Sequence, residues 1–346
     1  MNGSRTWVSV CLVVGLLAGP ASALVMDTVP VGNAGNAVDT RYATPGYGSV
    51  ASAYRIGKFE VTAGQYTEFL NAVAKTDTYG LYSTSMWSSS TGCSIRQTGG
   101  SGNYTYLVDA NGDGIEDGDW ANRPVNYVSY WDACRFSNWL NNGQATGAQN
   151  ASTTEDGSYT LNGYTGDDGR TIQRNANARW VVPSEDEWYK AAYHENDGVT
   201  GNYWNYPTGT SAVPNNGNPE ADTGNSANFY DGDYTIGSPY WRTPAGYFGN
   251  SDSPYGTFDQ GGNVWEWNDS VVYEYDTWSE RGRRGGSFGQ DSHAALHLHA
   301  SNRSSSAPMN DSAGLGFRVA EVPEPATGGL FLVGGLILAR RRRALR

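Results

Sequence analysis

Cysteine is scarce in this chain of 346 residues, which contains only Cys11, Cys93 and Cys134. Cys11 lies in an N-terminal apolar segment, and the two cysteines of the body cannot build a disulfide-stapled scaffold. Whether Cys93 and Cys134 form a disulfide bond is left undecided, because the sequence supplies no geometry to test it. The alternative for Cys134 is a buried thiol, since it lies within an apolar helical pattern.

Positive charge is also scarce, with 23 Lys and Arg against 35 Asp and Glu. Without the two terminal segments described below, which hold Arg5, five tail arginines and Glu324, the body has 17 basic and 34 acidic residues. Such an acidic body argues against binding to nucleic acid, whose phosphates attract Lys and Arg. It suits calcium, a hard cation that takes oxygen ligands.

Hydrophobic runs long enough to span a membrane are missing. The N-terminal run, 7–18, and the C-terminal run, 326–339, are both shorter than the ~20 residues that a membrane-spanning helix needs. Within residues 1–23, Arg5 precedes the first run and Ala21-Ser22-Ala23 follows it. This pattern is typical of a secretory signal peptide that signal peptidase cuts after Ala23, and the length of the run disfavours the alternative, a membrane anchor.

The C-terminal segment, residues 323–346, combines Pro323-Glu324-Pro325, the short apolar run and four consecutive arginines at 340–343. This order resembles the PEP-CTERM sorting signal. The resemblance implies transient inner-membrane attachment, with the arginines on the cytoplasmic side, and later removal of the tail by an exosortase. The expected location is the periplasm, outer envelope or extracellular matrix of a Gram-negative-type bacterium. A permanent tail anchor is the alternative.

The body is rich in glycine and aromatic residues, with 45 glycines and 13% aromatic residues. This composition predicts much irregular structure held by large buried side chains. Capping residues followed by apolar stripes predict three helices, which begin after Thr62, Ser129 and Ser184. Gly143 is expected to end the second helix. Short strands are expected within residues 53–61, 178–182 and 316–322.

Six segments of the body together resemble the sulfatase-modifying-factor family, whose best-known member is the formylglycine-generating enzyme. They are "YRIGKFEVTAGQYTEFLNAV", "RPVNYVSYWDACRFSNWL", "VVPSEDEWYKAAY", "GTFDQGGNVWEW", "RGGSF" and "GLGFRVA". The resemblance implies one compact α+β domain with low regular secondary structure over residues 49–322, preceded by a lead segment, 24–48.

The same resemblance implies a calcium site in "FDQGGNVWEW". By position its ligands are the side chains of Asp259 and Glu266 and the carbonyls of Gly262 and Val264. The chemistry is sensible, because glycines between two carboxylates let a loop wrap oxygen atoms around one cation. The alternative is that Glu266 only caps or pairs, with the tryptophans as core.

A second calcium site of the family maps to Asn228 and the carbonyl of Phe229. Its remaining ligands would fall near Ser238 and Tyr240, where the acidic residue of the family is absent. A third candidate does not depend on the family: "DANGDGIEDGDW" resembles an EF-hand loop but has Trp120 at its last ligand position. A solvated acidic loop is the equal alternative. Its candidate ligands are Asp109, Asn111, Asp113 and Asp117.

Catalytic members of the family have two cysteines after "GGS" that bind copper. The register between Ser287 and Arg303 places Gln290 and Ala295 at these positions. Neither can form a thiolate or bind a soft copper(I) ion in the same way. We therefore expect no formylglycine formation by the known route, with Ser287 and Trp265 as candidate residues of the old groove.

Three of the four histidines, His293, His297 and His299, follow this segment. On an extended strand they would face one way, with Leu296 and Leu298 on the other face. Such a set can hold Cu, Fe or Zn if the chain bends near Ala295. The alternative is a polar strand face that lines the groove.

Two functions therefore remain. The first is a non-catalytic, calcium-stabilised envelope protein whose groove binds a peptide or a glycan such as an exopolysaccharide, with aromatic residues of "GNYWNYPTG" or "SPYWRTP" available for stacking on sugars. The second is a diverged oxidase that uses a histidine-bound copper or iron.

Overall fold

The structure is a computed structural model that describes residues 23–217, 222–289 and 294–323. It contains two four-stranded sheets and one separate hairpin. The first sheet has the order β1-β2-β10-β5 and is antiparallel throughout. It joins strands far apart in the chain: β1 Thr28–Val31, β2 Tyr54–Gly57, β10 Ala320–Glu321 and β5 Trp180–Val181. The lead segment, 24–48, is thus part of the domain through β1.

The second sheet has the order β8-β7-β6-β9, and its centre is the long antiparallel pair β6–β7. Its strands are β6 Trp265–Glu274, β7 Ser279–Arg284, β8 Ser304–Ser306 and β9 Leu315–Gly316. The separate hairpin pairs β3 Ile95–Thr98 with β4 Thr105–Val108. Most of the chain between these short strands is irregular, as the glycine-rich composition predicts.

The three predicted helices begin directly after their predicted caps. They are α1 Ala63–Val73, α4 Tyr130–Asn141 and α5 Glu185–Tyr193, and each has a complete capping box. Three one-turn helices add to them: α2 Ser85–Ser88, α3 Gly118–Ala121 and α6 Ala294–His297. In the described ranges, no helix is long and apolar enough to cross a membrane.

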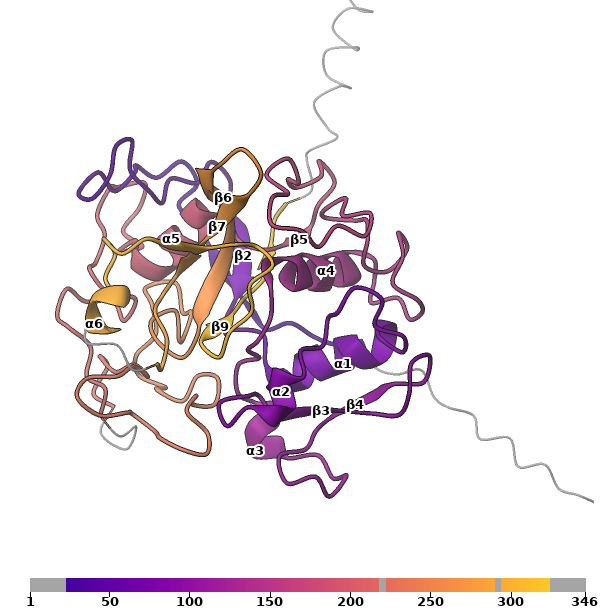
Figure 1. Cartoon of the computed structure of the whole chain (residues 1–346). Coiled ribbons are helices and arrows are strands. Elements are labelled where there is room, and N and C mark those ends of the chain that lie inside the picture. The colour runs from indigo at the N-terminus through magenta and orange to yellow at the C-terminus, as the bar shows by residue number, and fades with distance from the viewer. Residues whose placement is uncertain (1–22, 218–221, 290–293, 324–346) are drawn as a thin grey trace, which may run out of the picture.

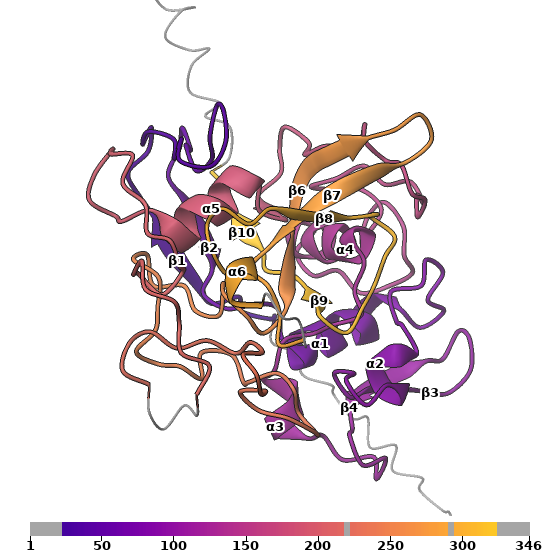
Figure 2. The same cartoon turned by 60° about the vertical axis from the view of Figure 1, so that its left-hand side comes forward.

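Aromatic side chains form the centre of the core. The ring of Phe69 on α1 lies 5.3 Å from the rings of both Phe136 and Trp139 on α4, and Phe317 packs against Phe136 at 5.4 Å. Such pairs contribute about 0.5–1.5 kcal/mol each beyond the area they bury. Figures 1 and 2 show that α1 and α4 lie on one side of the β6–β7 pair, while α5 and α6 lie on the other.

The two cysteines of the body are both free and buried. Burial raises the pKa of the Cys134 thiol to about 12, so almost no reactive thiolate is present near neutral pH. The structure therefore places Cys134 as the buried thiol of α4 and does not join it to Cys93.

Candidate functional site

The candidate groove is built around Trp265, the first residue of β6. The guanidinium of Arg283, on the neighbouring strand β7, lies 5.0 Å from the centre of the indole ring. The imidazole of His297 lies 5.1 Å from the same ring. A side chain added to Gly314 would meet the Ser287 Oγ at 2.9 Å and the Trp265 Cδ1 at 4.0 Å, so these three residues are close neighbours. The site combines an aromatic face with a cation, an imidazole and a hydroxyl.

The segment that carries these histidines is anchored at both ends to one carboxylate. Arg284 at the end of β7 donates to Glu185 Oε1 at 2.9 Å, and Arg303 donates to Glu185 Oε2 at 2.7 Å. Glu185 is the first residue of α5 and is buried, so the two ion pairs are largely shielded from water. The segment between Arg284 and Arg303 therefore closes as a loop against the N-terminus of α5.

Of the two alternatives for the histidine segment, the extended strand is not what the described residues form. Residues 294–297 form the helical turn α6, and strand β8 begins only at Ser304. A helical turn breaks the two-residue alternation, so Leu296 is 55% exposed whereas Leu298 is fully buried. Ala295 lies in this turn and is half-buried. Gln290 and His293 lie outside the described residues.

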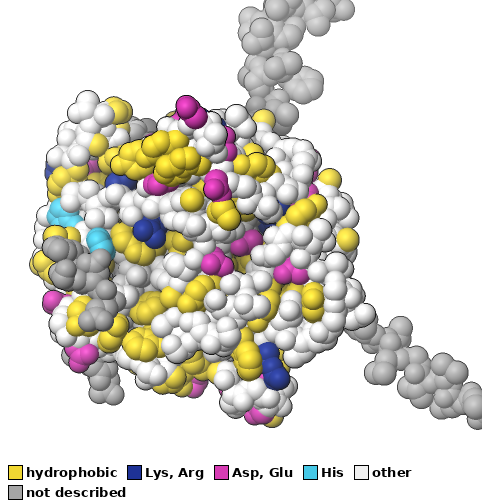
Figure 3. All heavy atoms as spheres, viewed as in Figure 1, with side chains coloured by type: hydrophobic (Ala, Val, Ile, Leu, Met, Phe, Trp, Pro, Cys, Tyr) yellow, Lys and Arg dark blue, Asp and Glu magenta, His cyan; other side chains and the backbone are white. Residues whose placement is uncertain are grey.

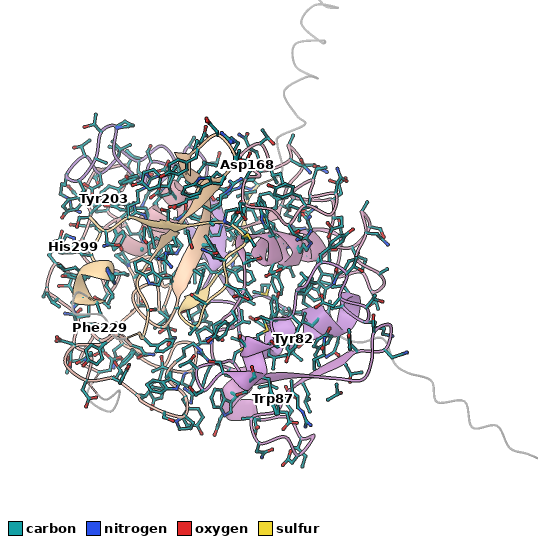
Figure 4. The ribbon with its side chains drawn as sticks, viewed as in Figure 1. Tyr82, Trp87, Asp168, Tyr203, Phe229 and His299 are labelled. Atoms are coloured by element: carbon teal, nitrogen blue, oxygen red, sulfur yellow. The ribbon has the colours of Figure 1, made fainter. Side chains whose placement is uncertain are left out.

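His297 and His299 have different aromatic neighbours. The His297 ring contacts Trp265, whereas the His299 ring lies 5.4 Å from Tyr42 and 5.2 Å from Tyr206. The His299 Nδ1 also lies 2.8 Å from the Ser301 hydroxyl oxygen. Figure 4 shows His299 beside α6, and the histidines of the face shown in Figure 3 gather at one edge.

Among the residues that the structure describes, no group of three or more His, Cys, Asp or Glu side chains is arranged to hold a metal ion. His297 and His299 therefore have no third described ligand of this kind. The proposed transition-metal set depends on His293, which the structure does not describe.

The fourth histidine, His194, is structural. Its side chain is fully buried directly after α5. Its Nδ1 accepts from the Asn196 amide at 3.1 Å and lies 2.8 Å from the Tyr255 hydroxyl, while its Nε2 lies 3.2 Å from the Thr200 carbonyl oxygen. These partners suit a neutral ring protonated at Nε2.

We predict that acidification destabilises the protein in part through His194. Burial lowers the pKa of His194 below its ordinary value of 6.5. The unfolded chain then binds the proton more readily, so His194 lowers stability as the pH falls through about 6.5. A His194→Gln variant should lose less Tm than the native chain between pH 7 and pH 5. Equal losses measured by calorimetry would show that His194 does not contribute.

The predicted calcium segment places Glu266 in a buried ion pair. Arg318 donates to Glu266 Oε2 at 2.5 Å and to Oε1 at 2.7 Å. The indole of Trp188 also donates to Oε2, at 2.7 Å. Both carboxylate oxygens are therefore engaged, which agrees with the alternative that Glu266 pairs. The Asp259 Oδ2 accepts a hydrogen bond from the backbone N–H of Gly246 at 2.6 Å.

Glu60, which the sequence reasoning missed, belongs to the same buried cluster. It lies between β2 and α1, and neither of its carboxylate oxygens has a hydrogen-bond partner among the residues that the structure describes. Burial, followed by the charges of Asp259 and Glu266, raises the pKa of Glu60 well above its ordinary value. No alternation in the sequence indicated this burial, because β2 ends at Gly57 and both Glu60 and the next residue, Val61, are buried.

The charges of this cluster do not balance. Three carboxylates, Glu60, Asp259 and Glu266, share the guanidinium of Arg318, and the buried guanidinium of Arg242 also acts on Glu60, so negative charge remains in excess if all are ionised. Burial raises the pKa of Asp259 to about 6, with a further contribution from Glu266. Protons or one divalent cation would neutralise the excess. Among the described residues, the acids of this cluster, like the histidines, do not form a group arranged to hold a metal ion, so the free oxygens of Glu60 are the feature that favours a cation here.

The segment of the second proposed calcium site lies against the first. Asn228 forms a parallel bridge with Gly262, and its side-chain amide donates to Asn263 Oδ1 at 2.8 Å. The Phe229 carbonyl accepts from Thr235 at 3.2 Å, and Phe229 itself is buried. Asn228 is therefore held by protein contacts, and Figure 4 shows Phe229 at the left of the lower half of the molecule.

In the loop that resembles an EF-hand, the described contacts engage most of the expected ligands. Arg96 donates to Asp109 Oδ2 at 2.9 Å, and the amides of Gly112 and Asp113 donate to its Oδ1. Burial alone would raise the pKa of Asp109, but Arg96 and the backbone amides outweigh it and lower that pKa. Asn111, Asp113 and Asp117 also accept from amides of the loop. The side chains expected to bind calcium thus accept hydrogen bonds from within the loop and from Arg96.

Two of the five aromatic residues expected to stack on sugars belong to the core, and the other three are half-buried. Tyr203 and Tyr206 are each only 4% exposed. Tyr240 packs against Arg123, whose guanidinium lies 3.9 Å from the ring centre, and Trp241 donates to the Ser90 carbonyl. Packing therefore takes up the two tyrosines of the first segment, whereas Trp204 between them is half-buried, so stacking through Trp204 stays a prediction.

Three solved structures are similar to this chain at low sequence identity, and the first of them has a TM-score above 0.5. A structure titled "Crystal Structure of CarF" is 20% identical, with a TM-score of 0.54, and the match covers 87% of this chain and 99% of that one. Treponema denticola variable protein 1 is 18% identical over 86% of this chain and 95% of its own, with a TM-score of 0.48. PvdO from Pseudomonas aeruginosa is 17% identical over 80% and 82%, with a TM-score of 0.40.

The family itself is shown by sequence. No curated protein matches the chain. The model of the sulfatase-modifying factor enzyme 1-like domain, however, matches residues 21–322. This range confirms the single α+β domain that the six motifs predict, and the chain belongs to the FGE-sulfatase family.

Proposed function

We propose that this protein is an exported, calcium-stabilised member of the family that binds a peptide or glycan and does not make formylglycine. The observation that carries the proposal is Ala295 in α6, at the position of a catalytic cysteine. A methyl group cannot bind copper, while Ser287 and His297 still lie beside Trp265, which is only 9% exposed. We infer that this face of the molecule still binds a ligand although the thiol chemistry is lost.

Calcium is proposed in the cluster of Glu60 and Asp259, completed by the carbonyls of Gly262 and Val264, with Glu266 shared with Arg318. A bound cation would fix the loop that leads directly into Trp265. Rigid support of this kind lowers the entropic cost of ordering a binding surface. The proposed role of calcium is therefore structural, because the ion would hold the loop that supports the Trp265 site.

Export rests on the two terminal segments, 1–23 and 323–346, with signal peptidase and an exosortase as processing partners. The alternative function is a diverged oxidase with copper or iron at His293, His297 and His299. It has the support of three imidazoles within seven residues of each other. The two functions require different resident metals.

Metal analysis of the purified chain tests the proposal. We expect stoichiometric calcium and no stoichiometric copper or iron. Copper or iron that is lost in a His297→Ala, His299→Ala double variant would favour the oxidase. Binding should then be measured against glycan and peptide arrays with native protein and Trp265→Ala. We expect a signal that the substitution removes, whereas an unchanged signal would place the binding surface elsewhere.

A further inference from the structure

A pocket of about 560 Å³ lies where the described chain begins, between α1 and the C-terminal end of α4. Its lining includes Ala23 and Leu24, the two residues on either side of the expected signal-peptide cut, together with Glu68, Trp139 and Gln144. Figure 1 shows α1 and α4 side by side in this part of the molecule. The proposed functions do not use this pocket.

The side chain of Gln144 pairs with both backbone polar groups of Leu24. Its Oε1 accepts the Leu24 amide N–H at 2.6 Å, and its Nε2 donates to the Leu24 carbonyl at 2.7 Å. The two residues are 120 positions apart in the chain. A primary amide that binds one backbone residue through both of its ends fixes the position and the direction of that residue.

The backbone of Gln144 is held in an uncommon conformation. Its φ is +61°, in the left-handed region that disfavours residues other than glycine, and it directly follows Gly143 with φ +70°. Such a conformation costs roughly 1 kcal/mol and persists only where surrounding contacts maintain it. Here the Gln144 amide donates to the Trp139 carbonyl at 2.8 Å. The uncommon backbone conformation of Gln144 thus occurs at the residue whose side chain binds Leu24.

Leu24 is also held by its side chain. Leu24 and Met26 pack against the main core, whereas Val25 between them is 78% exposed. This alternation leads into β1, which pairs with β2. The position of the Leu24 nitrogen is therefore set by packing as well as by Gln144.

The electrostatics of the pocket favour a cation. Glu68 lines it with an exposed carboxylate, which among the described residues makes no hydrogen bond or ion pair. The C-terminal end of α4 carries the negative end of the helix dipole towards the same place. A neutral amide N–H at Leu24 would interact only weakly with this negative potential. A positively charged ammonium group at the same place would be stabilised by it.

We propose that this pocket binds the chain's own α-ammonium group after processing. Hydrolysis adds water across the Ala23–Leu24 peptide bond; the carboxylate leaves with the leader and the amine remains on Leu24, where it takes up a proton. Gln144 Oε1 accepts one of its N–H groups, Glu68 supplies the opposite charge, and removal of Ala23 makes room for both. Processing thereby locks the mature N-terminus to α1 and α4. The inference rests on the export part of the proposed function.

The test uses the chain beginning at Leu24, released from a tag by a protease that leaves no extra residue. Only an unprotonated amine is acylated, and the Glu68 carboxylate raises the pKa of the α-amine. At pH 7 we expect acylation at Leu24 to be about fivefold slower than in a free peptide with the same first residues. In Glu68→Gln most of this protection should disappear. Mass spectrometry of the N-terminal peptide separates this amine from the lysines.

A matched control removes one carboxylate from an exposed loop, Asp231→Asn, and should leave the protection unchanged. Acylation at the peptide rate in the native chain, or equal protection in Glu68→Gln, would overturn the proposal. Because this chain begins at Leu24 by design, failure here says nothing against export. Export fails separately if envelope-derived protein still carries residues before Leu24.

Discussion

Removal of calcium with EDTA is expected to lower the Tm of the purified protein by roughly 4 °C. A ligand present at 100 times its Kd and bound only by the folded state adds about 2.7 kcal/mol of stability. For a domain of about 300 residues, this free energy corresponds to roughly that change in Tm. Scanning calorimetry with and without chelator measures the shift, and magnesium should not replace calcium, because it prefers a smaller octahedral shell.

The response to chelation should be lost in Asp259→Ala and in Glu60→Gln. Glu60→Gln has a second expected signature. Without calcium it removes a buried acid that is costly to ionise, so the chelated variant should be at least as stable as the chelated native chain. With calcium present, the same variant should be the less stable of the two. This reversal separates a ligand from a residue that is merely buried.

Asp113→Asn is the matched control, since Asp113 is exposed in the loop that resembles an EF-hand. It should retain the full response to EDTA. If the response disappears in this variant and survives in Asp259→Ala, calcium binds in the loop at 109–117. If neither chelation nor any of these substitutions changes the melting curve, the cluster around Glu60 holds no calcium.

Incubation with a cysteine-containing sulfatase-type peptide, copper and oxygen is expected to yield no aldehyde. The known chemistry of the family needs two thiolates, and this chain has Gln290 and Ala295 at the two positions. Cys93 and Cys134 cannot replace them, because both are buried and the pKa of each is raised by burial. A family member with both cysteines serves as the positive control, with mass spectrometry to detect conversion of the peptide.

Aldehyde formation in the native chain would contradict this expectation, and two variants would then locate its source. Loss of turnover in a His297→Ala, His299→Ala double variant would favour the diverged oxidase, whose imidazole-bound metal is less thiophilic than a thiolate site. Turnover that survives both substitutions would place the active site outside the Trp265 groove.

Local features of the fold could be read from the sequence, because short-range interactions decide them. Thr62, Ser129 and Ser184 each cap a helix through bonds to a residue three positions later, and all three caps lie where expected. The family motifs predicted the single α+β domain in the same way, since each motif is a short contiguous segment. The identity of residue 295 likewise needs no structure, because an alanine carries no thiol in any conformation.

The interactions of the candidate site were decided by tertiary structure. Glu60, Glu266 and Arg318 come from distant parts of the chain, and nothing local indicates that Arg318 occupies both oxygens of Glu266 or that Glu60 stays unpartnered. The predicted histidine strand failed for a related reason. Arg284 and Arg303 both bind Glu185, so the intervening segment must turn back, and α6 forms within it. Long-range ion pairs and packing override local alternation because an unpaired buried charge costs more free energy than a change in backbone conformation.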